Sequence, residues 1–214
     1  AVTETYDGTS FTEVGDLNTA RYGMGAASAG TQTATLSYGG TKAPSNAMAG
    51  ETESWNGSSW TELTDLNSAR TQISSIGVQT SALCAGGTTG PTYLTINESW
   101  DGTSWTELGD LNTIRYAGGA SGVSNTSGLV FGGVPYTGSP PDGMPLTELW
   151  NGSSWTEVND LNTGRAANSG AGTQTQTISY AGNPSNQNNT LPEFWNETSW
   201  TELADLSTGR NATS

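Results

Sequence analysis

Apolar side chains recur at fixed intervals along this chain, separated by stretches rich in Ser, Thr, Asn and Gly. The recurring stretch runs from Glu53 through the aromatic pair Trp55 and Trp60 to Arg70. Five versions of it are present, and they begin at Glu4, Glu53, Glu98, Glu148 and Glu193. A period of roughly 20–50 residues is typical of solenoids and propellers. The pattern therefore predicts a repeat architecture.

The aromatic and basic residues follow the repeat closely. All eight tryptophans belong to it, at Trp55, Trp60, Trp100, Trp105, Trp150, Trp155, Trp195 and Trp200. The first copy carries Tyr6 and Phe11 in their place. Five of the six basic residues close a copy: Arg21, Arg70, Arg115, Arg165 and Arg210. We interpret these residues as structural because each recurs with the period of the architecture.

A second element lies between the copies, a short apolar run that ends in a pair of small residues. Its four versions end at Gly39-Gly40, Gly86-Gly87, Gly132-Gly133 and Ala181-Gly182. Small residues precede each run, and they permit the close backbone approach that crowded inner strands require. No segment shows the i, i+3, i+4, i+7 spacing of an amphipathic helix. Each unit is therefore predicted to contain four short strands.

In the first complete unit the strands are expected near residues 21–29, 33–40, 51–55 and 60–63. The chain 1–214 is then a single domain, with a partial unit at 1–21 and complete units at 22–70, 71–115, 116–165 and 166–210. Because there are five copies of the second hairpin and only four of the first, the N-terminal hairpin is predicted to be half of a fifth sheet.

The tip of the second hairpin contains four residues, such as Asn56-Gly57-Ser58-Ser59. An Asn-Gly pair usually indicates a two-residue type I′ turn, which needs positive φ at both central positions. Glu197 in the last copy fits that turn badly. A four-residue loop around a type I turn is therefore expected, with the two flanking aromatic residues opposite each other.

The linker after the fourth strand reads Asp-Leu-Asn-Ser/Thr-x-Arg, so it carries an acid and a base at its two ends. Ion pairs between Arg and a carboxylate of this region would fix the angle between consecutive units. We therefore expect repeat-to-repeat ion pairs in which the linker Asp and Arg have a joint role, with Glu62 near them in one copy. The residues are Asp65 and Arg70, Asp110 and Arg115, Asp160 and Arg165. A ligand site built from the arginines is the alternative.

The segments after the second strand vary in length and chemistry, and all eight prolines lie in them. In a four-stranded meander they emerge on the same side as the linkers, and loops on a rigid scaffold often carry binding function. The candidate binding residues in these segments are Lys42, Tyr93, Tyr136 and Asp142.

The composition of the chain argues against two classes of partner, nucleic acids and membranes. With 20 acidic residues against six basic ones, the net charge is −14. Nucleic acid and anionic membranes would repel such a chain. No apolar run approaches the ~18 residues of a transmembrane helix, so membrane insertion is not expected.

Catalysis is the weakest class of function for this sequence. There is no His, and the single Cys84 lies in an apolar run where a buried core residue is the favoured interpretation. Nearly every acid recurs with the repeat, whereas a catalytic pair of carboxylates should break the symmetry. We expect neither an enzyme nor a cofactor or metal site.

The Gly pair after strand two, the aromatic residue ending strand three and the Trp of strand four together resemble kelch-type β-propeller repeats. The resemblance covers nearly the whole chain, with Ala181-Gly182 and the pair Tyr6 and Phe11 as departures. It implies an all-β propeller of four-stranded antiparallel blades. Counting the hairpins favours five blades, one of them split between the termini or thinned there; the alternative is that the sequence is a segment of a longer chain.

The sequence motif Trp-Asn-Gly-Ser-Ser-Trp-Thr-Glu-Leu, followed by the linker, is also similar to motifs in repeat proteins of marine bacteriophages. That resemblance implies a non-enzymatic structural or adhesion module at the virion surface or outside the cell. The implied partners are other virion proteins or a glycan or protein of the host surface, and a homo-oligomer within a symmetric particle suits this role. A secreted carbohydrate-binding propeller is the alternative.

Overall fold

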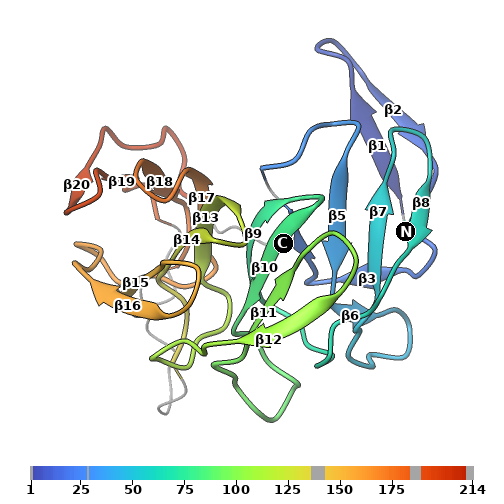
Figure 1. Ribbon diagram of the computed structural model, residues 1–214. Helices are drawn as coiled ribbons and strands as arrows, with labels where there is room; N and C mark the ends of the chain where they lie inside the picture. The colour runs from blue at the N-terminus through green and yellow to red at the C-terminus, as the bar shows by residue number, and fades with distance from the viewer. Residues whose placement is uncertain (1, 28, 136–142, 184–188, 211–214) are drawn as a thin grey trace.

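The fold is built from short antiparallel strands. The structure, a computed structural model, describes residues 2–27, 29–135, 143–183 and 189–210. These residues form twenty strands and no helix. Four four-stranded antiparallel sheets follow one another along an arc in a propeller-like arrangement (Figure 1). The predicted all-β class and the four strands per unit are confirmed.

The strands are numbered along the chain. The N-terminal hairpin consists of β1 (Thr3–Tyr6) and β2 (Phe11–Val14). The first sheet contains β4 (Gly25–Ala26), β5 (Thr35–Tyr38), β7 (Thr52–Trp55) and β8 (Trp60–Glu62). The second contains β9 (Ser74–Val78), β10 (Ser81–Ala85), β11 (Asn97–Trp100) and β12 (Trp105–Leu108). A short extra pair joins β3 (Arg21–Tyr22) to β6 (Thr41–Lys42).

The remaining two sheets repeat this plan. The third contains β13 (Gly119–Ser124), β14 (Ser127–Phe131), β15 (Thr147–Trp150) and β16 (Trp155–Val158). The fourth contains β17 (Ser169–Gly172), β18 (Thr177–Tyr180), β19 (Glu193–Trp195) and β20 (Trp200–Glu202). In each sheet the strands pair in chain order, so every sheet is a simple meander.

The first strands of neighbouring sheets approach closely at the inside of the arc, where β9 contacts β13 and β13 contacts β17. A Cβ atom on Gly170 would lie 2.4 Å from the carbonyl oxygen of Ala120. Any larger residue at this position would separate the two strands. The small residues predicted for the inner strands therefore serve backbone packing.

The hydrophobic core lies between the sheets. In the first interface, Trp100 and Trp105 of the second sheet pack with Leu36 and Tyr38 of the first. The other two interfaces have the same construction. The tryptophan pair of the third sheet packs against the second sheet, and that of the fourth sheet packs against the third. Each sheet thus presents its tryptophans to the preceding sheet and a strand-two Leu to the following one.

The outer hairpins have the predicted register. Trp55 lies opposite Trp60, with their ring centroids 5.4 Å apart, and the other three tryptophan pairs repeat this contact. The tip contains four residues, and the side chain of Asn56 accepts hydrogen bonds from the backbone N–H groups of Ser58 and Ser59. An Asn or Asp at the first tip position is therefore a local cap of the turn.

The expected type I turn is wrong. The second tip residue has positive φ in every copy, and Glu197 has φ of +82° where the other four copies have glycine. A type I turn would need a negative angle there. The Asn196 side chain holds the turn by accepting from Thr198 and Ser199, so the conformation persists without glycine.

A hydrogen bond between sheets accompanies three of the tryptophans. The indole Nε1 of Trp105 donates to the Thr52 hydroxyl at 2.9 Å, and Trp60 and Trp200 donate in the same way to Thr3 and Thr147. Asn97 occupies the corresponding position for Trp155. There, both the Asn97 Oδ1 and the Trp155 Nε1 are buried without a hydrogen-bond partner.

The substitution Asn97→Thr should therefore stabilise the protein, because it restores the hydroxyl acceptor at nearly constant volume. We expect the free energy of unfolding to rise by about 1 kcal/mol, the net value of one hydrogen bond. Equilibrium urea denaturation measures this change. The reverse substitution at an equivalent position, Thr147→Asn, is the control and should lower stability; an Asn97→Thr protein less stable than wild type would contradict the assignment.

Candidate functional site

Four buried ion pairs join the linkers to the sheets that follow them. Arg21 Nη2 lies 2.9 Å from Glu53 Oε1, and Arg115 Nη2 lies 2.7 Å from Glu148 Oε1. Two further pairs join the equivalent residues, Arg70 with Glu98 and Arg165 with Glu193. All eight side chains are at most 1 % exposed. The charges are therefore part of the protein interior and inaccessible to a ligand.

The carboxylate of each pair is fully hydrogen-bonded. Glu98 accepts from the backbone N–H groups of Asn67 and Ser68 and from the Asn67 side chain, whose amide also donates to the Trp105 carbonyl. Arg70 donates further to the carbonyls of Cys84 and Gly86. These bonds offset the cost of removing the two charges from water. The linker is thereby held against the next sheet.

The expected repeat-to-repeat ion pairs are present, but their carboxylate is not that of the linker. The ion pairs are formed with the first Glu of the next repeat copy, whereas Asp110 and Asp160 of the linkers accept hydrogen bonds from Thr95 and Thr147. The linker turns its Arg away from its own Asp because the guanidinium enters the next sheet. Only the three-dimensional arrangement brings the repeat's Glu and the preceding Arg together.

The variable segments and the linkers do share one face, as the meander predicted. The N–H groups of Leu66 and Arg70 donate to the carbonyls of Gly50 and Ala49, and Leu111 and Leu161 are bonded similarly to Thr95 and Pro145. These hydrogen bonds attach the ends of three variable segments to the linkers, and the linkers are held in turn by the buried ion pairs.

The candidate binding residues make different contacts on this face. Lys42 lies on β6 and forms an ion pair with Glu51, with 36 % of its side chain exposed. Tyr93 stacks on Tyr116, with ring centroids 4.6 Å apart. Tyr136 and Asp142 lie outside the described residues. Tyr116 was missed, although its place directly after a closing Arg marks it as a neighbour of the loops.

The Tyr93–Tyr116 pair forms a half-buried aromatic patch. Burial raises the pKa of the Tyr116 phenol, and its hydrogen bond and charge interaction with Tyr93 act in the same direction. The Tyr116 phenol therefore remains neutral at physiological pH. An aromatic patch with hydroxyl groups suits a polar ligand with an apolar face, such as a sugar ring.

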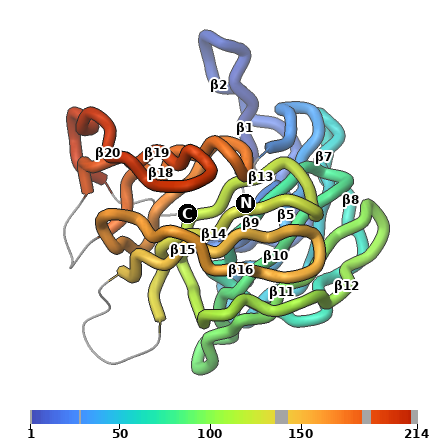
Figure 2. Tube along the Cα trace, turned by 60° about the vertical axis from the view of Figure 1, so that its left-hand side comes forward, coloured from blue at the N-terminus to red at the C-terminus, as the bar shows by residue number. Residues whose placement is uncertain are grey.

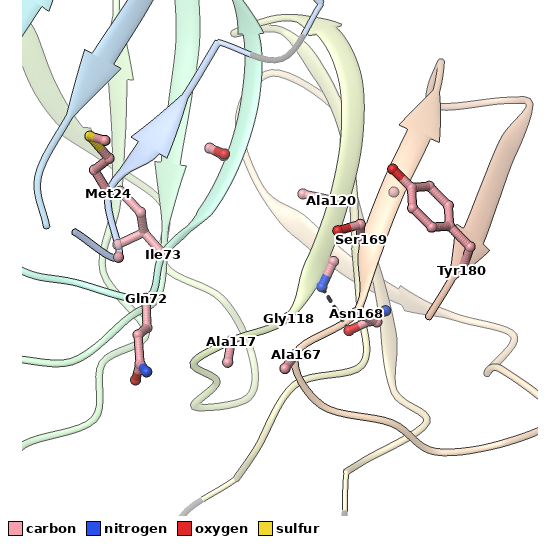
Figure 3. Close-up of a pocket in the computed structure, with 14 residues that line it drawn as sticks. Met24, Gln72, Ile73, Ala117, Gly118, Ala120, Ala167, Asn168, Ser169 and Tyr180 are labelled. Atoms are coloured by element: carbon pink, nitrogen blue, oxygen red, sulfur yellow. Dashed lines mark hydrogen bonds between the residues drawn. The ribbon is translucent and has the colours of Figure 1, made fainter. Parts of the chain in front are cut away.

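A cavity of about 510 Å³ opens at the inner ends of the sheets. Figure 3 shows that its walls come from equivalent positions of successive sheets, including Gln72, Ala117 and Ala167. Asn168 is fixed there by accepting from the Gly119 N–H at 3.0 Å and donating to Ser179. The described lining contains no acidic or basic side chain, so the cavity offers polar and apolar contacts without charge.

A chain of backbone hydrogen bonds surrounds this cavity. The Gln72 N–H donates to Gly23, the Ala117 N–H to Gln72, and the Ala167 N–H to Ala117, at 2.8–2.9 Å. The residues at all four positions have positive φ, three of them without being glycine. Sequence reasoning missed this feature because alanine and glutamine rarely adopt that conformation.

The described residues bring together no catalytic constellation. Burial raises the pKa of the Cys84 thiol to about 12, so this side chain stays protonated at neutral pH and cannot act as a thiolate nucleophile. Within the described ranges, no three acidic or Cys side chains gather as a metal site. No described helix is long and apolar enough to cross a membrane.

No protein-family model and no curated protein sequence matches this chain.

The buried pairs should dominate stability. Glu98→Gln keeps the shape of the side chain and leaves the Arg70 charge without its partner, which should cost about 3–5 kcal/mol of unfolding free energy. Guanidinium denaturation of the purified protein measures the loss. Glu107→Gln is the matched control, since Glu107 lies across the β11–β12 hairpin from Glu98 and is exposed. It should change stability by less than about 0.5 kcal/mol. Equal effects of the two substitutions would contradict the structural role.

Proposed function

We propose that this protein is a non-enzymatic module of a bacteriophage virion surface, in which a rigid propeller presents variable loops to a host surface or a neighbouring virion protein. The observation that carries the proposal is that the repeated Arg and Glu side chains pair with each other inside the protein. Arg70, Glu98 and their equivalents are committed to internal ion pairs. Recognition therefore falls to the loops, which differ from unit to unit while their frame stays constant.

The architecture proposed for this role is a kelch-like propeller of five positions. The four four-stranded sheets occupy four of them, and the N-terminal hairpin β1–β2 is the outer half of the fifth. Trp60 of the first sheet donates to Thr3 of this hairpin, as the second and fourth sheets are linked to their predecessors. A disc of this kind has one loop-bearing face and suits repeated display on a symmetric particle.

The virion assignment can be tested by imaging. Antibodies raised against the purified protein should label intact phage particles at multiple symmetric positions in electron micrographs, because a surface module is present in many copies. Particles stripped of the protein by mild denaturant provide the unlabelled control. Detection of the protein only as a free secreted species, with unlabelled particles, would overturn the virion proposal.

A secreted carbohydrate-binding role is the second candidate, and the Tyr93–Tyr116 stack favours it. A glycan array should then show binding by wild type, with at least about tenfold weaker binding by Tyr93→Ala, because stacking on a sugar is lost. Tyr136→Ala tests the neighbouring loop in the same way.

Val123→Ala is the control in the array, because Val123 is an exposed apolar residue at the far end of β13, away from the loops. It should leave glycan binding unchanged. A wild-type protein that binds no glycan on the array would exclude the lectin role and leave the structural one.

A further inference from the structure

The two ends of the arc expose side chains that are buried everywhere else in the repeat. At the N-terminal end, Tyr6 and Phe11 are 45 % and 67 % exposed, whereas the tryptophans in the same positions of the last three copies are at most 6 % exposed. At the other end, Ile178 is 39 % exposed, while Leu36 and its counterparts Leu83 and Leu129 are fully buried. Each end is half of the interface that joins neighbouring sheets.

The charges at the two ends are complementary. Glu4 of the N-terminal hairpin occupies the position of Glu53, Glu98, Glu148 and Glu193, but it is exposed. Arg210 occupies the position of the four buried arginines, and it is exposed as well. The closing Arg and the first Glu of the repeat copies form ion pairs at the four internal junctions. Among the described residues in these two repeat positions, Glu4 and Arg210 have no ion-pair partner. Each end therefore carries the charge that the other lacks.

The polar contacts at the two ends match too. At three of the four internal junctions a tryptophan Nε1 donates to a Thr hydroxyl of the preceding sheet. Phe11, at the tryptophan position, has no N–H group to donate. Pro192, at the threonine position of the fourth sheet, has no hydroxyl to accept. A Phe facing a Pro leaves no buried donor unpaired, so the two departures from the repeat compensate each other.

The linker that ends at Arg210 retains most of the donors that hold a glutamate. In the internal linkers, two backbone N–H groups bind the carboxylate, as Asn67 and Ser68 bind Glu98. Ser207 and Thr208 supply the same two N–H groups. Ser207 replaces the Asn whose side chain adds a third bond, so this linker offers one donor fewer.

The two ends do not meet within one chain. Figures 1 and 2 place β1–β2 and the fourth sheet at opposite ends of the arc. The hairpin is tied to the first sheet by the Trp60 bond to Thr3 and by the Gln32 side chain, which donates to the Tyr6 carbonyl. Closing the arc would disturb interfaces that are fixed by buried ion pairs. Contact between different molecules leaves those interfaces intact.

We propose that the open face of the fourth sheet (Ile178, Tyr180, Leu203 and the adjacent Arg210) binds the aromatic face of the N-terminal hairpin (Glu4, Tyr6 and Phe11) of a second copy of this chain. Glu4 pairs with Arg210, and Phe11 packs on Tyr180 as Trp105 packs on Tyr38, whose ring centroids are 4.8 Å apart. The contact is head-to-tail, so it generates a ring or a filament.

Two charge reversals test this contact. Sedimentation velocity over a concentration series should show association of wild type, and E4R and R210E should each weaken it at least about tenfold, since like charges then face each other. An equimolar mixture of E4R and R210E should recover association, because every contact in an alternating assembly again pairs opposite charges. Both residues are exposed, so the variants should keep the circular dichroism spectrum of wild type.

E107R is the control for E4R, because it makes the same change in net charge at an exposed position of β12 in the second sheet. It should associate like wild type. A wild-type protein that stays monomeric at every concentration overturns the proposal. Closure within one chain is indicated instead by two results together. The double variant E4R/R210E is monomeric with wild-type stability, and the mixture of E4R and R210E recovers neither association nor that stability. Neither result bears on the glycan or virion tests.

Discussion

The rest of the structure depends on the buried pair between a linker Arg and the first Glu of the next repeat. Each pair stands at the junction of two sheets, where Arg70 reaches into the second sheet and the Asn67 linker binds the same Glu98. A lone buried charge is costly, so a junction with only one partner would be strongly disfavoured. The pairs therefore restrict how one sheet can follow another, and the tryptophan clusters between the sheets supply the apolar burial that the pairs do not.

This constraint separates framework from recognition. Residues that recur with the repeat are used to hold sheets together, while the segments between the second and third strands are free to differ once their backbones are bonded to the linkers. Lys42, Tyr93 and Tyr116 lie in or beside that loop-bearing region. The inner cavity is different in character, because its walls are largely backbone and small side chains brought together from successive sheets. The described lining of the cavity carries no acidic or basic side chain, whereas the loop-bearing region carries the Lys42–Glu51 pair.

In a repeat architecture, the two ends expose the surfaces that are buried between neighbouring sheets elsewhere. The interface between sheets has two different halves, so an arc of sheets always leaves one half of each kind uncovered. Here the uncovered halves carry opposite charges at Glu4 and Arg210 and matched losses of polar groups at Phe11 and Pro192. Association through these ends uses the same chemistry that builds the interior, which is why the proposed contact needs no new type of interaction.

The sequence by itself determined the strands, their order and the aromatic hairpins, because these follow from local spacing: Trp55 and Trp60 flank a four-residue tip whatever lies around them. It also identified Cys84 as a core residue and placed the loops beside the linkers. Only the tertiary structure decided which carboxylate meets each Arg, since Arg70 and Glu98 are 28 residues apart and the nearer Asp65 was an equally good partner by charge. The Tyr93–Tyr116 contact and the inner cavity were likewise decided by contacts between distant segments, which local spacing does not encode.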